Sequence, residues 1–342
     1  MLLPVPDKFR NLIDKSASLN GKPLDLDSIS FRAPHEKFTC VHYGIMIPNL
    51  PEPFRFLNMI TVIGQPRLKI FRNQHLIKTT ALDTANVLIG SGIATPDFFN
   101  GYSVEQACDI RPDGSFLKFG QDLVIQGSYP NFRATRETSN FKYDLNLKAT
   151  DKIAHFAKLK ADFYDHWALL CQYDGFLEYN GNKTTVNGLC TFEYARAADI
   201  NLPFKFFTYQ ILNINADTQV LLVELLGPLN LIIQRRAYIR SLDDVGRVYS
   251  KHVKFTVHTL FDEIKVTPDG DAMQMPQFLS WRIHDDDNQE LLVIDGHCNN
   301  DFCYGMAAGY AGSYRYTGRY KGENIQGNGY IEYIDHRQNP EH

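Results

Sequence analysis

The chain contains the same short motifs twice, in the same order, within its 342 residues. The motifs are Y-x-G, then [VI]-x-G, and then an E-Y pair five positions after the second glycine. They occupy residues 179–181, 186–188 and 193–194 in the first copy, and residues 320–322, 325–327 and 332–333 in the second. Repetition of this kind indicates that one structural unit has been used twice.

Further correspondences extend the match upstream in both copies. They are Pro112-Asp113-Gly114 with Pro268-Asp269-Gly270, residues 123–127 with 292–296, and the apolar runs after Tyr43 and Tyr209 that end at Gly64 and Gly227. The sequence therefore predicts an N-terminal segment (residues 1–37) followed by two domains, residues 38–202 and 203–342, joined near Leu202-Pro203.

Local patterns favour strands over helices. From Thr39 to Ile47, apolar residues alternate with the others, so that Tyr43 and its neighbours two positions away share one face. Pro-Asp-Gly and Asn-Gly steps supply hairpin turns. Helical spacing occurs only near Pro6–Lys15 and from Asp151 to Tyr164. The pattern predicts an all-β chain of two antiparallel barrels or sandwiches with few short helices.

Composition narrows the classes of function. The net charge is −4 with a pI near 6.3, so no basic surface for nucleic acid is expected. Six cysteines show no C-x-x-C pair, and neither a signal peptide nor a run of about 20 apolar residues is present. We therefore expect a cytoplasmic protein with reduced thiols and no stable membrane insertion. Serine hydrolase, P-loop and Rossmann signatures are absent, and no cofactor is expected.

The last strand of each copy carries a resemblance to a known group. Residues 327–333 (G-N-G-Y-I-E-Y) resemble the terminal hairpin of the carotenoid 1,2-hydratase and AttH-like proteins, and residues 186–194 resemble the end of that group's first barrel. The resemblance implies two tandem antiparallel lipocalin-like β-barrels of the calycin type. It also implies an apolar ligand of terpenoid, steroid, fatty or polyketide-like chemistry.

Two positions depart from that group. The aromatic first strand of the group reads Val41-His42-Tyr43 here, and the acid-histidine pair at the end of its first barrel reads Glu193-Tyr194. An acid chemistry that used that histidine is therefore not carried over.

Glu193 and Glu332 are the first candidates for catalysis. Strand alternation places Glu193 on the face of Thr191, and Glu332 on the face of Tyr330. If these faces line a cavity or the seam between barrels, desolvation would raise a carboxyl pKa and create a general acid. The other interpretation is that both side chains face solvent, as most glutamates do, or that they bind backbone N–H groups at the mouth of a barrel.

His42 is the third catalytic candidate, as an acid/base partner reaching into the barrel beside Tyr43. Alternation favours the other interpretation, in which Tyr43 faces the core and His42 faces out. Aromatic side chains are the candidates for ligand binding, or else for core packing: Tyr43, Trp167, Tyr194, Tyr209, Trp281, Tyr330 and Tyr333. Trp167 follows an acid and an imidazole in Asp165-His166-Trp167, which suits the stabilisation of positive charge.

No metal site is expected, because the polar run His284–Asp287 lies between two apolar segments and fits a solvated hairpin turn. The leading functional hypothesis is an apolar-ligand protein with hydratase, cyclase or isomerase chemistry. The alternatives are a carrier or stress-response binder without catalysis, and a structural module that binds a protein partner. Phe9, Leu12 and Ile13 form an amphipathic start that caps a barrel or else contacts a membrane surface peripherally.

Overall fold

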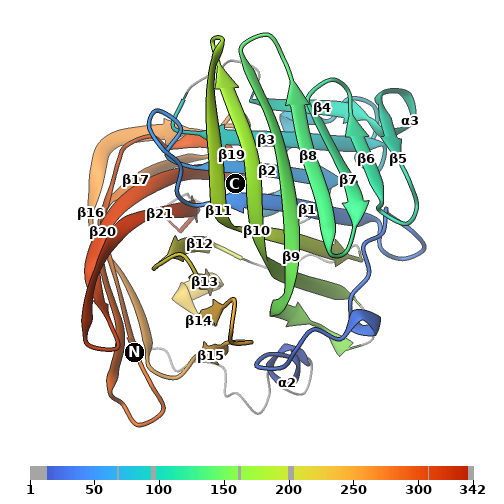
Figure 1. The fold of residues 1–342 in the computed structure, drawn as a ribbon. Coiled ribbons are helices and arrows are strands. Elements are labelled where there is room, and N and C mark those ends of the chain that lie inside the picture. The colour runs from blue at the N-terminus through green and yellow to red at the C-terminus, as the bar shows by residue number, and fades with distance from the viewer. Residues whose placement is uncertain are drawn as a thin grey trace.

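A computed structural model describes residues 14–67, 69–93, 98–160, 163–198, 204–306 and 308–337. Strands make up nearly all of the regular structure in these residues, which confirms the predicted all-β class (Figure 1). The short helices are α2 (Ser16–Leu19), α3 (Val104–Ala107), and the 3-10 turns η1 (Leu26–Ser28), η2 (Lys69–Phe71), η3 (Gln74–Leu76) and η5 (Pro228–Asn230).

The first sheet has eleven antiparallel strands in the order β4-β3-β2-β1-β11-β10-β9-β8-β7-β6-β5. Its strands are β1 (Cys40–Ile47), β2 (Leu57–Ile63), β3 (Thr84–Ser91), β4 (Phe99–Ser103), β5 (Cys108–Ile110), β6 (Phe116–Phe119), β7 (Leu123–Ser128), β8 (Asn131–Glu137), β9 (Phe141–Lys158), β10 (Tyr164–Tyr179) and β11 (Asn182–Ala197).

The second sheet has ten antiparallel strands in the order β15-β14-β13-β12-β21-β20-β18-β17-β16, with β19 paired to β20 beside this path. Its strands are β12 (Phe206–Asn213), β13 (Thr218–Leu226), β14 (Ile232–Ser241), β15 (Arg247–Tyr249), β16 (Val253–Val266), β17 (Ala272–His284), β18 (Glu290–Cys298), β19 (Cys303–Met306), β20 (Gly309–Tyr320) and β21 (Glu323–Asp335).

Both sheets follow one plan. In each, the first strand pairs with the last, β1 with β11 and β12 with β21. The two edge strands are consecutive in the chain, β4 and β5 in one sheet and β15 and β16 in the other. Consecutive edges bring each sheet back toward itself, as a barrel requires. The predicted junction near Leu202-Pro203 lies outside the described residues, so the predicted domain boundaries stay predictions.

The alternation predicted for β1 is confirmed. Tyr43 and Ile45 lie in the apolar core enclosed by the first sheet, whereas Met46 lies in a separate cluster on the opposite face. Tyr43 is opposite Tyr194 in the register of β1 with β11.

The helix predicted from Asp151 to Tyr164 is wrong, because β9 continues through this region to Lys158. Ile153 packs in the core of the first sheet, while Ala154 and Phe156 pack on its other face. Because both faces of the strand are buried, apolar and polar residues do not alternate regularly along it, and the spacing of its apolar residues resembles that of a helix. The helix predicted at Pro6–Lys15 lies almost wholly outside the described residues.

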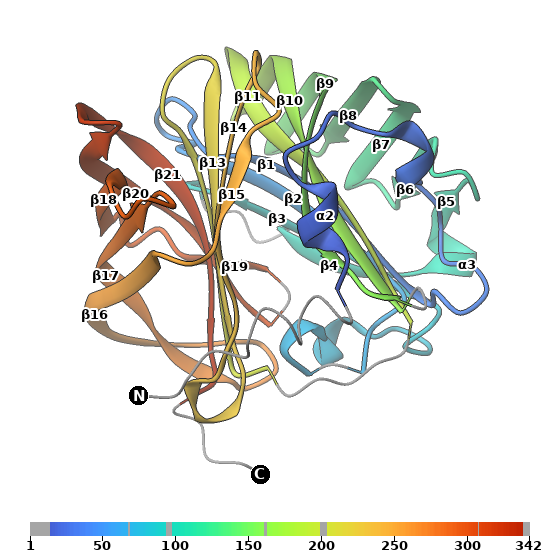
Figure 2. The same ribbon diagram turned by 90° about the horizontal axis from the view of Figure 1, so that it is seen from below.

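The two sheets meet face to face along their central strands. Strands β1, β9, β10 and β11 of the first sheet face strands β12, β13, β14 and β21 of the second, and we call this buried interface the seam (Figure 2). Its apolar cluster comprises Met46, Phe56, Ala154, Phe156, Ala168, Tyr209, Ile211, Leu221, Val223, Tyr238, Ala311 and Tyr330.

A buried guanidinium crosses the seam. Arg240 of β14 donates from Nη1 to the Ala168 carbonyl oxygen at 2.6 Å, and from Nη2 to the Leu169 carbonyl oxygen at 3.3 Å. It also donates to Oε1 of Gln219 at 2.8 Å. Burial lowers the pKa of Arg240 to about 10, so the side chain still carries its charge at neutral pH. The interaction fixes β14 against β10.

The described helices include none that is long and apolar enough to cross a bilayer. None of the six cysteines forms a disulfide bond in the described residues, and their redox state stays a prediction. The polar run predicted as a turn joins β17 to β18, where Asp286 and Asp287 are exposed. A cytoplasmic location stays a prediction.

Replacing Arg240 with Met should lower the free energy of unfolding by about 3 kcal/mol, because carbonyl groups of β10 and the Gln219 amide lose a charged donor inside the seam. Urea unfolding measures the change. Arg247→Met, at a side chain that is 61% exposed, is the control and should change it by less than about 0.5 kcal/mol. Equal effects of the two substitutions would contradict the role given to Arg240.

Candidate functional site

Two of the predicted catalytic residues, Glu193 and His42, lie side by side on the seam, and His166 joins them. His42 on β1 and His166 on β10 both pair with Ala195 of β11, the strand between them. Glu193 is two residues from Ala195 and shares its face, so its carboxylate lies between the imidazoles. Its Oε2 atom is 3.4 Å from Nε2 of His166 and 3.8 Å from Nε2 of His42.

Small neighbours leave room for this cluster. Glu193 is flanked by Gly44 on β1 and by Ala168 on β10. A Cβ atom on Gly44 would lie 3.0 Å from two atoms of the His42 ring, which is tighter than ordinary packing. The glycine therefore allows the imidazole to lie over the strand and reach Glu193.

The Nδ1 atom of each imidazole also has a hydrogen-bond partner. Nδ1 of His42 donates to the carbonyl oxygen of Thr61 at 3.0 Å, and Nδ1 of His166 lies 3.1 Å from the Tyr164 hydroxyl. A carbonyl oxygen can only accept, so Nδ1 of His42 carries a hydrogen. Both rings consequently present Nε2 to the Glu193 carboxylate.

Glu193 is 3% exposed, so the interpretation of this residue as outward-facing is wrong. Burial alone raises the pKa of a carboxyl group. Hydrogen bonds and positive charge from His166 and His42 outweigh burial and lower the pKa of Glu193 to about 2. Glu193 is therefore a buried carboxylate that keeps its negative charge at neutral pH.

Glu332 lies on the seam face of β21 and is also 3% exposed, so the outward-facing interpretation fails here too. Its Oε1 atom accepts a hydrogen bond of 2.8 Å from the Tyr330 hydroxyl. Burial raises the pKa of Glu332 well above its ordinary value, and the negative charge of Glu193 raises it further. The two carboxyl groups thus belong to one electrostatic site and differ in their hold on a proton.

Tyr209 connects the two carboxyl groups. It is opposite Glu332 in the register of β12 with β21. Burial raises the pKa of its hydroxyl well above the ordinary value, and the neighbouring Glu193 charge adds to this. Both this hydroxyl and Oε1 of Glu193 are buried, and neither has a hydrogen-bond partner within the described residues.

The other predicted ligand-binding residues lie in two places away from the seam. Tyr43, Trp167 and Tyr194 line the interior of the first sheet, where the Tyr194 ring lies 5.2 Å from that of Tyr43 and 5.3 Å from that of Trp167. Trp281 and Tyr333 belong to the core of the second sheet. Of the seven predicted aromatic residues, only Tyr209 and Tyr330 adjoin the carboxyl groups.

Phe31 of the N-terminal segment enters the first interior. Its ring lies 4.9 Å from that of Trp167, in an edge-on arrangement, and 6.2 Å from that of Tyr43. The Tyr43 hydroxyl and Nε1 of Trp167 are buried there and find no hydrogen-bond partner among the described residues. The segment therefore occupies an aromatic space in which polar atoms are unsatisfied.

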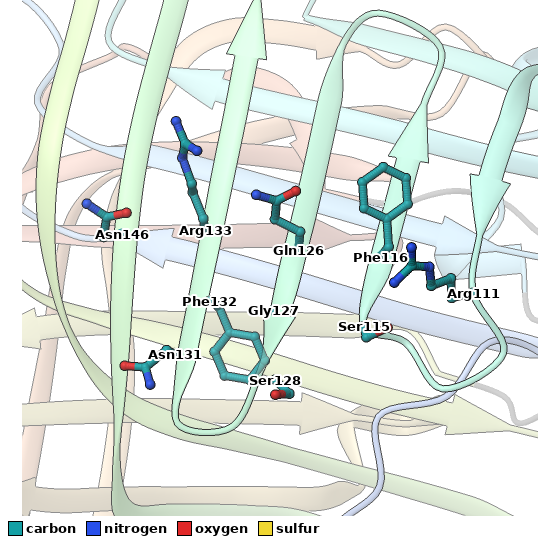
Figure 3. Close-up of a pocket in the computed structure, with 10 residues that line it drawn as sticks. All are labelled: Arg111, Ser115, Phe116, Gln126, Gly127, Ser128, Asn131, Phe132, Arg133 and Asn146. Atoms are coloured by element: carbon teal, nitrogen blue, oxygen red, sulfur yellow. The ribbon is translucent and has the colours of Figure 1, made fainter.

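A pocket of about 650 Å³ opens between β6 and β9 (Figure 3). Polar side chains such as Gln126, Asn131 and Arg133 line it, and Arg133 is already paired with Asp144. None of the residues predicted for catalysis or ligand binding lines this pocket. It is a separate surface feature and not part of the Glu193–Glu332 site.

His166 belongs to this cluster but is not among the candidates that the sequence predicts. The sequence does carry a signal, because strand alternation in Asp165-His166-Trp167 places His166 on the face opposite Trp167. The missing information was the pairing of β1, β10 and β11, which brings histidines from positions 42 and 166 to one carboxylate.

Two antiparallel sheets, each brought back toward itself, are the predicted fold class, and comparison with solved structures confirms that fold. A candidate AttH protein from Nitrosomonas europaea matches with a TM-score of 0.58 and 14% identity, over 98% of this chain and 100% of that one. Kievitone hydratase from Nectria haematococca matches with a TM-score of 0.51 and 13% identity, over 92% and 96%.

The chain belongs to the family described as "Family of unknown function (DUF6670)", which matches residues 60–342. No curated protein sequence matches it.

Glu332→Gln should change how stability depends on pH. A raised folded-state pKa contributes stability that is fully present below the unfolded value, near 4.5, and is lost as pH rises toward the folded value. Relative to the unmodified protein, the variant should therefore gain stability with rising pH, by at most about 1.4 kcal/mol per pH unit, between the unfolded and the folded pKa values of Glu332.

Urea unfolding at pH 5, 6 and 7 measures this gain. Glu323→Gln, at an exposed position on the same strand, is the control and should show no such trend. A pH-independent difference between Glu332→Gln and the unmodified protein would mean that Glu332 does not hold its proton on folding.

Proposed function

We propose that the seam binds an apolar small molecule, of terpenoid, steroid, fatty or polyketide-like chemistry, and performs hydratase, isomerase or cyclase chemistry on it. The observation that carries this proposal is the pair of buried carboxyl groups. Glu193 has a pKa lowered to about 2, whereas the pKa of Glu332 is raised. When their surroundings move the pKa values of two carboxyl groups in one site apart, the group with the raised pKa can act as an acid and the other stays an anion.

In this proposal Glu332 is the proton donor. It gives its proton to one carbon of a carbon–carbon double bond, and positive charge develops on the other carbon. Glu193 is too weak a base to take up that proton readily, but its negative charge stabilises the cation. In hydration, water bonds to the cationic carbon and releases one proton to solvent, and solvent reprotonates Glu332.

The surroundings suit an apolar guest. Phe156 lies beside both the imidazole of His166 and the ring of Tyr209, with ring centroids 4.7 and 5.6 Å apart. Aromatic faces stabilise positive charge, and apolar walls bind an apolar molecule by removing its surface from water. The side chains of His42 and His166 are 20% and 21% exposed, so the cluster reaches the surface at one end.

The comparisons support the class of chemistry through the fold alone. Kievitone hydratase, by its name, is a hydratase with this two-sheet fold. At 13% identity the likeness concerns the fold, so the residue roles proposed for this chain depend on its own geometry.

The test is a panel of terpenoids, sterols and unsaturated fatty acids incubated with the protein, with products analysed by mass spectrometry for a gain of one water or an isomeric product. Glu332→Gln keeps the size of the side chain but removes the acid, and should lower turnover about 100-fold or more while ligand binding is retained. Glu323→Gln should leave turnover unchanged. Unchanged turnover in Glu332→Gln would refute the role of the acid.

A second candidate, a carrier without catalysis, is favoured by the aromatic interior of the first sheet. Phe31 fills that space, and its displacement by a largely apolar ligand with one polar group would give the Tyr43 hydroxyl or the Trp167 indole a hydrogen-bond partner. Removing the Phe31 ring opens room for about one aromatic ring, so Phe31→Ala should tighten the binding of an apolar probe.

Tryptophan fluorescence locates that probe. Binding in the first interior should quench the emission of Trp167, so Trp167→Phe should abolish the quenching and Trp281→Phe should retain it. The opposite pattern, or no effect of Phe31→Ala on affinity, would count against a carrier site at this position.

A further inference from the structure

We propose that His42, His166 and Glu193 form a binding site for one Zn²⁺ ion at the open end of the seam. Their ligand atoms all lie within 4.8 Å of one another, and no other group of histidine, cysteine, aspartate and glutamate side chains in the described residues has this arrangement. Two imidazole nitrogens and one carboxylate oxygen are a donor set that zinc accepts in proteins.

The distances suit an ion after a small contraction. Zinc-ligand bonds of about 2.0–2.1 Å at tetrahedral angles place neighbouring ligand atoms about 3.3 Å apart. Oε2 of Glu193 is already 3.4 Å from Nε2 of His166 and 3.8 Å from Nε2 of His42. Both distances exceed this spacing by about 0.5 Å or less, and the ligand atoms of the whole set lie within 4.8 Å of one another, so rotation of the imidazole side chains would bring them to an ion.

Hydrogen bonding already orients the ligands. Nδ1 of His42 donates to the Thr61 carbonyl oxygen, so in the neutral ring Nε2 carries a lone pair aimed at the Glu193 carboxylate. The proton that lies between Nε2 and the carboxylate in the metal-free protein is released when an ion takes its place. A histidine that donates its far N–H to a carbonyl oxygen is also the usual arrangement around a bound metal.

The site has an entrance and a free coordination position. Both imidazoles are partly exposed, whereas the Glu193 side chain is 4% exposed. Three protein ligands leave the fourth position of zinc to water, as in catalytic rather than structural zinc sites. The ion and the cation-stabilising role proposed above use the same Glu193 carboxylate, so they belong to separate states of the site, and zinc binding is measured without any apolar ligand.

The experiment is a calorimetric titration with Zn²⁺ of full-length protein that has been treated with a chelator and dialysed. The expected result is one site per chain, with affinity about tenfold weaker or more in each of His42→Ala, His166→Ala and Glu193→Gln. The last variant keeps the size of the side chain and guards against loss of the fold. His252→Ala removes an exposed histidine elsewhere and should leave the affinity unchanged.

Co²⁺ provides a second measurement. Cobalt in this site should give visible ligand-field bands without thiolate-to-metal charge transfer, because no cysteine belongs to the set. The proposal is overturned if the protein binds no stoichiometric Zn²⁺, if all three variants bind as well as the unmodified chain, or if a thiolate band shows that cysteines hold the ion.

Discussion

The central strands of the first sheet are buried on both faces, and the other features of the seam depend on this constraint. One face of β1, β10 and β11 lines the interior of their own sheet, and the other packs against the second sheet. On such strands a buried polar side chain must find a partner within the protein in place of water. Glu193 finds two histidines, and the Arg240 guanidinium finds carbonyl groups of β10.

The same constraint produces the electrostatic asymmetry of the site. Two carboxyl groups at one seam cannot both ionise at low cost. The histidines stabilise the charge of Glu193, whereas within the described residues the Glu332 carboxyl group has the Tyr330 hydroxyl as its hydrogen-bond partner and therefore retains its proton more strongly. Equivalent glutamates of the repeated motif thus acquire opposite properties from their neighbours, although their local sequences are alike.

Strand alternation explains what could be predicted from the sequence. It placed Tyr43 in the core, and it placed Glu193 and Glu332 on the faces opposite Phe192 and Ile331, as the structure has them. It could not say what covers those faces, because packing of one sheet on another is a long-range property. Exposed glutamate was therefore the wrong default here.

The long-range packing of strands and sheets also explains why the sequence does not predict the role of His166 and why it suggests a helix around Ile153. His166 and His42 are 124 positions apart in the chain and are brought together by the pairing of their strands with β11. No local sequence motif therefore indicates that they lie in one cluster. The sequence from Asp151 to Tyr164 suggests a helix because a strand that is buried on both faces does not show the regular alternation of apolar and polar residues by which strands are recognised.

The pairing of β1 with β11 has a consequence for how the chain is made. The first sheet can close only after residue 197 has been synthesised, when β11 reaches β1. At that moment the Met46 and Phe156 face is still uncovered, and apolar surface exposed during synthesis favours aggregation. The next strands to leave the ribosome are β12, β13 and β14, which are three of the four strands that cover this face; the fourth, β21, is the last strand of the chain. The order of the strands along the chain thus limits the time for which the seam is open to solvent.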